Sequence, residues 1–165
     1  MKLDHLEKLY VTQLKDAYSA EKQLLQALPK LRDNAHDEKL REAFEDHLGE
    51  TKAHVERIER IFQSLDNKPA GHRCRAMEGL VEEGEEVLGE DGDPGTLDAA
   101  LICAAQKVEH YEIATYGCLR EYARLLGHEE AVALLDQTLE EEKNADLRLT
   151  QLAEDWINQA AMHEA

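Results

Sequence analysis

The run HLGETKAH, which covers residues 47–54, places two imidazoles and a carboxylate in the middle of an otherwise apolar helical stripe. Residues three or four apart share one face of a helix, so His47, Glu50 and His54 would lie side by side. Leucine, phenylalanine and isoleucine residues occupy the same stripe before and after this run. Because a carboxylate buried without a partner costs several kcal/mol, Glu50 beside His54 predicts a site that binds protons or cations.

Acidic side chains interrupt the apolar stripes of the three other long helical segments in the same way. They are Glu21 in the first segment, Glu109 and Glu112 in the third, and Glu142 and Asp146 in the fourth. The two pairs are spaced three and four residues apart, so the members of each pair can share one helix face.

The sequence distance from each acidic residue to the nearest predicted turn gives its height in an antiparallel hairpin. With the first turn near Ala35 and the second at Gly127, the members of each pair come level to within about one residue, at a rise of ~1.5 Å per residue. The level pairs are Glu21 with Glu50, Glu112 with Glu142, and Glu109 with Asp146. Each hairpin is therefore expected to gather its acidic groups at one height.

These carboxylates and the His54 imidazole would carry too much negative charge to stay buried unless cations or protons neutralise it. Oxygen ligands with imidazole suit iron or manganese, and two metal ions bridged by carboxylates fit this set best. For some of these residues, a position outside the metal site is the alternative. Glu109 or Glu112 could lie on the helix edge, and Asp146 could face outward. Among the remaining histidines, His47 could support a ligand, whereas His110 and His128 read as surface or core-edge residues.

Helix-forming residues dominate the chain, and the periodic segments predict helices over residues 4–32, 37–65, 74–88, 96–126 and 128–160. Asp37 or Asn34 is the expected N-cap of the second helix, and Pro29 is expected to disturb the end of the first. Two helical hairpins joined by a connection of about 30 residues are typical of a ferritin-like four-helix bundle with one long crossover. We expect an all-α fold and one domain over residues 1–165.

Charge and hydropathy exclude several classes of partner. The chain has 36 acidic and 19 basic side chains, a formal net charge of −17. Such a surface repels phosphate backbones and anionic lipid, so binding to nucleic acid or to a membrane is not expected. The beginning of the chain, MKLDHLEKLY, lacks the apolar core of a signal peptide, and no apolar run approaches the ~20 residues of a membrane span.

The three cysteines, Cys74, Cys103 and Cys118, form no CxxC pair, and their number is odd. This pattern favours reduced thiols and a cytoplasmic location over a disulfide framework. Cys103 and Cys118 read as small core residues of the helix over 96–126. No Gly-rich phosphate loop and no GxSxG motif occurs.

The chain resembles the YciE/YciF-like family of ferritin-like bacterial stress proteins. The resemblance covers nearly the whole chain in five ordered segments, YVTQLKDAYSAEKQLLQALPKL, HLGETKAHVERIERIF, EGLVEEGEEVL, KVEHYEIATYGCL and LEEEKNADLRLTQLA. It implies a rubrerythrin-like bundle with a dinuclear metal site, in a protein that forms a homodimer. Carried over by position, it implies as metal ligands Glu21, Glu50, His54, Glu109, Glu112, Glu142 and Asp146.

The chain departs from the wider rubrerythrin-like pattern, in which Glu-x-x-His occurs on two helices. Here the second helix has Glu50-x-x-x-His54 and the fourth has Glu142-x-x-x-Asp146. One metal would then lack an imidazole ligand, which could favour another metal or unequal occupancy of the two positions.

The leading hypothesis is a dinuclear carboxylate protein that handles iron or acts on oxygen or peroxide, as a ferroxidase- or peroxidase-like oxidoreductase. We expect two metal ions, iron in the first place, with manganese or zinc as alternatives. Glu50 and Glu142 are the candidate bridging carboxylates. The alternatives are a non-catalytic bundle that serves assembly with a structural metal, and catalase-like disproportionation of peroxide at manganese.

Overall fold

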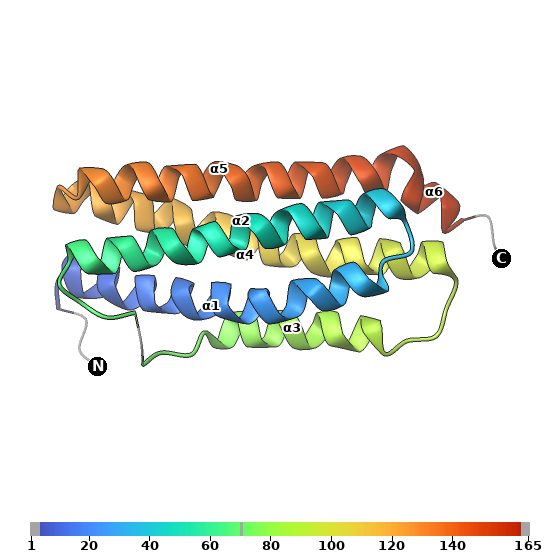
Figure 1. Ribbon diagram of the computed structural model, residues 1–165, viewed down its shortest axis with the longest axis horizontal. Coiled ribbons are helices and arrows are strands. Elements are labelled where there is room, and N and C mark those ends of the chain that lie inside the picture. The colour runs from blue at the N-terminus through green and yellow to red at the C-terminus, as the bar shows by residue number, and fades with distance from the viewer. Residues whose placement is uncertain (1–3, 70, 163–165) are drawn as a thin grey trace.

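Four long helices form the molecule's bundle, and the long axis of each lies roughly along the long axis of the molecule (Figure 1). The structure is a computed structural model and describes residues 4–69 and 71–162. The bundle helices are α1 (Leu6–Asn34), α2 (Glu38–Ser64), α4 (Pro94–Leu126) and α5 (Glu129–Leu152). They pair as the hairpins α1–α2 and α4–α5, and no strand occurs in the described part of the chain. The predicted all-α, ferritin-like bundle with a long crossover is confirmed.

Local capping explains where the hairpin helices begin and end. Asp37 caps α2 by accepting a hydrogen bond from the backbone N–H of Leu40 at 2.9 Å. Asp93 caps α4 in the same way, and Pro94 follows as the first helical residue, where its missing N–H costs nothing. Gly127 ends α4 with φ 77°, a left-handed conformation that glycine adopts without strain.

The crossover between the hairpins contains a fifth helix, α3 (Arg75–Leu88), which packs along α1 and α4 (Figure 1). Polar contacts hold its first residues. The Cys74 backbone N–H donates to the Ser19 hydroxyl at 2.9 Å, and the Gln23 side-chain amide donates to the Cys74 carbonyl at 3.0 Å. The Tyr111 hydroxyl lies 3.0 Å from the Cys74 thiol and donates to Asp16 at 2.6 Å.

A buried carboxylate near the start of α4 ties the two hairpins together. Asp98 is 3% exposed and accepts hydrogen bonds from the backbone N–H groups of His36 at 2.8 Å and Asp37 at 2.7 Å. From the end of the chain, the Trp156 indole N–H donates to Asp37 at 2.8 Å. The α1–α2 turn is therefore held by residues of the second hairpin and the segment after it.

The apolar core consists of two clusters, one toward each end of the bundle. The first gathers residues such as Leu24, Phe44, Leu101 and Leu149, and the second gathers Leu14, Ile61, Leu119 and Leu135. The buried histidines and glutamates of the bundle helices lie close to the sequence positions where one cluster gives way to the other. The core thus encloses a polar layer at mid-height.

Two sequence expectations on helix geometry differ from the structure, one in which residues are buried and one in the type of helix. Cys103 and Cys118 are exposed. The buried stripe of α4 passes through Ile102 and Leu119, and a neighbouring residue lies about 100° around the helix from each of them. The predicted last helix, 128–160, ends as α-helix at Leu152. A wider π-helical turn, Ala153–Ile157, and the short α6 (Asn158–Ala160) follow it.

None of the helices in the described residues combines the length and the hydropathy needed to cross a membrane.

Candidate metal centre

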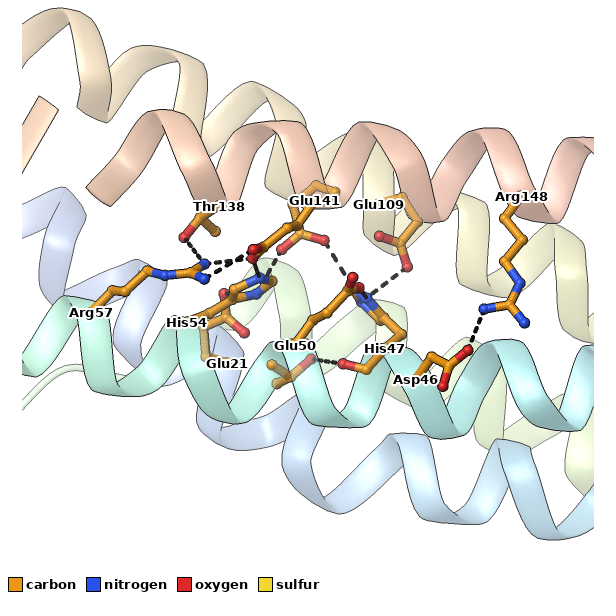
Figure 2. Close-up of polar contacts among 12 residues, drawn as sticks. Glu21, Asp46, His47, Glu50, His54, Arg57, Glu109, Thr138, Glu141 and Arg148 are labelled. Atoms are coloured by element: carbon orange, nitrogen blue, oxygen red, sulfur yellow. Dashed lines mark hydrogen bonds and ion pairs between the residues drawn. The ribbon is translucent and has the colours of Figure 1, made fainter. Parts of the chain in front are cut away.

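The inner face of α2 carries three buried polar residues at steps of four and three, His47, Thr51 and His54. The Thr51 hydroxyl donates to the backbone carbonyl of His47 at 2.9 Å, which satisfies it within the helix. The two imidazoles, two helical turns apart on α2, are left to face the other helices (Figure 2).

Two groups of potential ligands meet these imidazoles. One consists of His47 with Glu109, Glu112 and Glu142, and the other consists of His54 with Glu21 and Glu142. Within each group, one ligand atom from every residue lies within 4.8 Å of the others. Glu142 belongs to both groups, so the centre has two adjoining halves, each with one imidazole.

The distances between the groups are short. His47 Nε2 lies 3.4 Å from Glu109 Oε1 and 3.6 Å from Glu142 Oε2. His54 Nδ1 lies 3.0 Å from Glu142 Oε1 and 3.3 Å from Glu21 Oε1. These contacts are close enough for ion pairing, but neither ring nitrogen has the alignment of a hydrogen bond.

Most oxygens of the centre are buried without a hydrogen-bond partner. The unsatisfied atoms are His47 Nε2, His54 Nδ1, Glu21 Oε2, Glu109 Oε2 and both carboxylate oxygens of Glu112 and Glu142. Native proteins rarely leave buried polar atoms unpaired, and each unpaired atom calls for a missing proton or ion. The residues therefore fit bound metal ions.

Proximity to carboxylates keeps the imidazoles protonated in the metal-free protein. Burial lowers the pKa of His47, but Glu109, Glu50 and Glu142 outweigh it and raise that pKa to about 10. Burial also opposes the charge of His54, yet the carboxylates around it raise its pKa to about 12.

The carboxyl groups of the centre divide into two kinds. Burial, reinforced by the neighbouring carboxylates, raises the pKa of Glu112 well above the usual range, and burial likewise raises those of Glu109 and Glu21 despite the nearby imidazoles. Burial also acts on Glu142, but the protonated histidines outweigh it and lower its pKa. The metal-free centre thus stores protons that divalent cations can displace.

Charge balance fits two divalent ions. The two groups hold four carboxylates, those of Glu21, Glu109, Glu112 and Glu142, and two imidazoles. Four negative charges balance two doubly charged cations, with neutral imidazoles completing the ligand sets. A metal–ligand distance of about 2.1 Å places opposite ligands about 4.2 Å apart, which is close to the limit of 4.8 Å within which the ligand atoms of each group lie.

Outer contacts fix the orientation of two residues in the His54 group, His54 and Glu21. His54 Nε2 donates to Glu141 at 2.9 Å, and Arg57 holds the same carboxylate through Nη2 at 2.9 Å (Figure 2). Burial raises the pKa of Glu141, but hydrogen bonds from His54, Arg57 and Gln137 lower it to about 2. On the other side, the buried Tyr116 hydroxyl donates to Glu21.

The structure brings together five of the seven predicted site residues, Glu21, His54, Glu109, Glu112 and Glu142. Glu50 lies beside them with its side chain 40% exposed and bonded to His47 Nδ1 at 3.2 Å. Asp146 lies apart and accepts a hydrogen bond from Gln106 at 3.0 Å, with His110 3.4 Å away. The predicted level pair of Glu112 with Glu142 is in one group, whereas Glu109 meets His47 in place of Asp146.

Sequence reasoning underrated His47 and missed Glu141. His47 is seven residues before His54, two helical turns along the same face, and this spacing could have placed both rings inward. With His47 in place, each half of the centre has an imidazole, so the expected lack of a second one is not what the structure shows. Nothing in the spacing of Glu141 separates it from its acidic neighbours.

A family of known sequences matches this chain across its length. The match covers residues 5–162, and the family is described as a domain of unknown function, DUF892. The chain belongs to the DUF892 family. Protein YciF from Escherichia coli strain K12 is 48% identical over 166 residues, which is all of both chains. The resemblance to YciF-like proteins expected from the sequence is confirmed.

Solved structures agree with this assignment to DUF892. The crystal structure of the E. coli stress protein YciF is similar with a TM-score of 0.90, over 94% of this chain and 98% of that one. YcfI from Rhodopseudomonas palustris is 42% identical with a TM-score of 0.87, over 90% and 95%. A protein from Xanthomonas campestris pv. campestris, 20% identical with a TM-score of 0.76 over 96% of each chain, shares the fold.

Proposed function

We propose that the protein is a dinuclear carboxylate protein, which binds two divalent metal ions between its four helices and uses them in redox chemistry. The observation that supports this most is Glu142, a fully buried carboxylate common to two ligand groups that each contain one imidazole. Carboxylate bridges between ions in a helical bundle are the recurring form of di-iron and di-manganese centres.

Each residue has a role in holding the ions. His47, Glu109 and Glu112 would hold one ion, and His54 with Glu21 would hold the other. Glu142 would bridge them. Glu50, one turn from His54 and half-exposed, would approach as a further ligand if its side chain turned inward. Oxygen and imidazole ligands suit iron best, with manganese or zinc as alternatives.

Iron bound here would supply electron exchange with oxygen or peroxide. The chain's own contribution is a rigid site between two apolar clusters. Apolar clusters close the bundle above and below the polar layer, and the hydrogen bonds from Tyr116 and to Glu141 hold Glu21 and His54 in place. Because the E. coli relative is described as a stress protein, we propose iron handling or peroxide removal under stress.

Metal loading tests the binding part of this proposal. Purified protein loaded anaerobically with Fe(II) and then desalted should retain about two ions per chain, and Glu142→Ala should retain fewer than one. Glu140→Ala, the change of an exposed neighbouring carboxylate, is the matched control and should behave as the wild type. Retention of less than one ion per chain by the wild-type protein would overturn the proposal.

Reaction with oxygen separates the redox role from a structural one. Oxygen or peroxide added to the Fe(II)-loaded protein should produce a ferric absorbance band faster than in buffer, and Glu142→Ala should lose this acceleration. Two bound ions without any acceleration would instead support the structural alternative. Oxygen evolution from peroxide by the manganese-loaded protein would support catalase-like chemistry.

We also keep the homodimer and the cytoplasmic location as proposals. The exposed large apolar side chains in the described residues are Leu125, Leu147 and Met162, on or next to the second hairpin. None of these exposed apolar side chains lies on α1 or α2. Sedimentation of the wild type beside a Leu147→Lys variant would test whether these side chains lie in a dimer contact.

A further inference from the structure

A cavity of about 190 Å³ lies between α2 and α5, beside the metal centre. Its polar lining includes Asp46, His47 and Glu50 from α2, Glu109 from α4, and Arg148 from α5. Phe44 and Leu149 contribute apolar wall. The cavity therefore touches the half of the centre that contains His47 and Glu109.

The exposed fraction of the polar side chains falls from one end of this cavity to the other. Asp46 and Arg148 are 66% and 39% exposed, and Glu50 is 40% exposed. His47 and Glu109 are only 6% and 3% exposed. The cavity thus runs from a solvent-facing mouth to the buried ligands.

The side chains at the two ends differ in how they are paired. At the mouth, Arg148 Nη1 donates to Asp46 Oδ2 at 2.6 Å and joins α5 to α2 across the opening (Figure 2). At the inner end, His47 Nε2 and Glu109 Oε2 are buried without a hydrogen-bond partner. Glu50, as exposed as Arg148, connects with the inner end through its bond to His47 Nδ1.

We propose that divalent cations reach the metal centre through this cavity, and that the Asp46–Arg148 ion pair controls their passage. This inference rests on the proposed metal-binding function. Asp46, Glu50 and Glu109 offer carboxylate oxygens in succession from solvent to the centre, and a cation can exchange its water ligands for them one at a time.

The charges favour a cation over an anion as the species that passes. Asp46 and Glu50 present solvent-exposed carboxylates in the lining, and the whole chain has a formal net charge of −17, which repels anions. At the mouth of the cavity, the positive side chain of the lining is Arg148. Its ion pair with Asp46 offsets that charge. The pair therefore blocks the opening and also occupies the outermost carboxylate.

The test is to replace each residue of the ion pair in turn and to measure how fast the protein takes up metal ions. The two replacements should change this rate in opposite directions. Arg148→Gln removes the positive charge and frees Asp46, so uptake should become about threefold faster or more. Asp46→Asn removes the outer carboxylate and leaves Arg148 unpaired at the mouth, so uptake should become slower by a similar factor. If the pair served only to join the helices, both changes would act in the same direction.

The measurement is stopped-flow absorbance after mixing the metal-free protein with Co(II), followed by metal content at equilibrium. Arg120→Gln and Asp136→Asn break a comparable exposed ion pair between α4 and α5 at 2.7 Å and are the matched controls. Both controls should keep the wild-type rate, and all four variants should reach the wild-type stoichiometry.

The outcomes separate this inference from the proposed function. Absence of Co(II) binding by the wild-type protein would overturn the metal-binding proposal itself. Normal binding with unchanged rates in Arg148→Gln and Asp46→Asn, or with both rates shifted the same way, would overturn only the route.

Discussion

The two ring nitrogens of His54 face different carboxylates, with Nε2 2.9 Å from Glu141 and Nδ1 3.0 Å from Glu142. Glu141 is also bound by Arg57, and its low pKa keeps it ionised. An ionised Glu141 accepts the Nε2 proton, so Nδ1 is the nitrogen left for a metal ion. Such a contact fixes both the tautomer and the orientation of a ligand histidine.

We therefore predict that Glu141→Gln weakens metal binding without removing any ligand. The amide cannot pair with Arg57 as the carboxylate does, and it can present an N–H to His54. The dissociation constant of the weaker-bound ion should rise about 10- to 100-fold. Competition titration with a chromophoric chelator measures it. Glu140→Gln, which alters the neighbouring exposed carboxylate, should bind as the wild type does.

His47 is predicted to bind one metal ion directly, as His54 binds the other. His47→Asn should lower the retained metal from about two ions to about one per chain, because one half of the centre loses its imidazole. Elemental analysis after loading and desalting provides the count. His110→Asn, at a side chain 68% exposed, is the control. Full loading of His47→Asn would return His47 to the supporting role suggested by its spacing alone.

The metal-free protein is predicted to lose stability as pH rises from 6.5 to 8.5. His47 and His54 have folded-state pKa values of about 10 and about 12, above the value near 6.5 that applies to the unfolded chain. The folded state therefore binds more protons in this window, and the free energy of unfolding falls with rising pH. The raised pKa values of Glu109 and Glu112 act in the same direction.

Urea denaturation of chelator-treated protein at several pH values in this window tests the sign. The dependence should be weaker in His47→Gln. Metal-loaded protein should show the opposite trend, because protons compete with metal for the same ligands. A metal-free stability that stays constant or increases with pH would contradict the prediction.

Asp98→Ala is predicted to destabilise the fold without removing any residue of the candidate metal centre. Two backbone N–H groups, those of His36 and Asp37, would lose their acceptor, at a cost of about 2 kcal/mol. For a chain of this size, that corresponds to a melting temperature lower by about 4–8 °C. Thermal melts followed by circular dichroism would measure it. Asp91→Ala, an exposed change before α4, should leave the melting temperature within about 1 °C.

Periodicity was sufficient to predict the bundle, because it reports which face of each helix is buried. Turn chemistry was equally informative, since Asp37 and Gly127 occupy the cap positions their types predict. The π-helical turn at Ala153–Ile157 could not be found this way, because one residue more per turn leaves no mark in a short apolar pattern.

The centre was predicted less completely than the fold. Counting from the turns placed Glu112 level with Glu142, and the structure brings them into one group. The same count failed for Asp146, because height alone does not say which way a side chain points, and Asp146 turns toward Gln106 and His110. His47 was underrated because its spacing suggested only a bond to Glu50, and its second nitrogen faces helices that sequence spacing does not locate.

Asp98 also aligns the start of α2 with the start of α4, because it binds the backbone N–H of Asp37. α2 and α4 both run away from the end of the bundle where Asp98 holds Asp37 (Figure 1). His47 lies ten residues beyond Asp37 and Glu109 eleven beyond Asp98, so both sit about 15–17 Å from the clamp at ~1.5 Å per residue. Sliding one hairpin by a single residue would offset His47 from Glu109 by about 1.5 Å, a large part of one metal–ligand bond. The register of His47 against Glu109 is thus set at the far end of the molecule, by one carboxylate and two backbone amides.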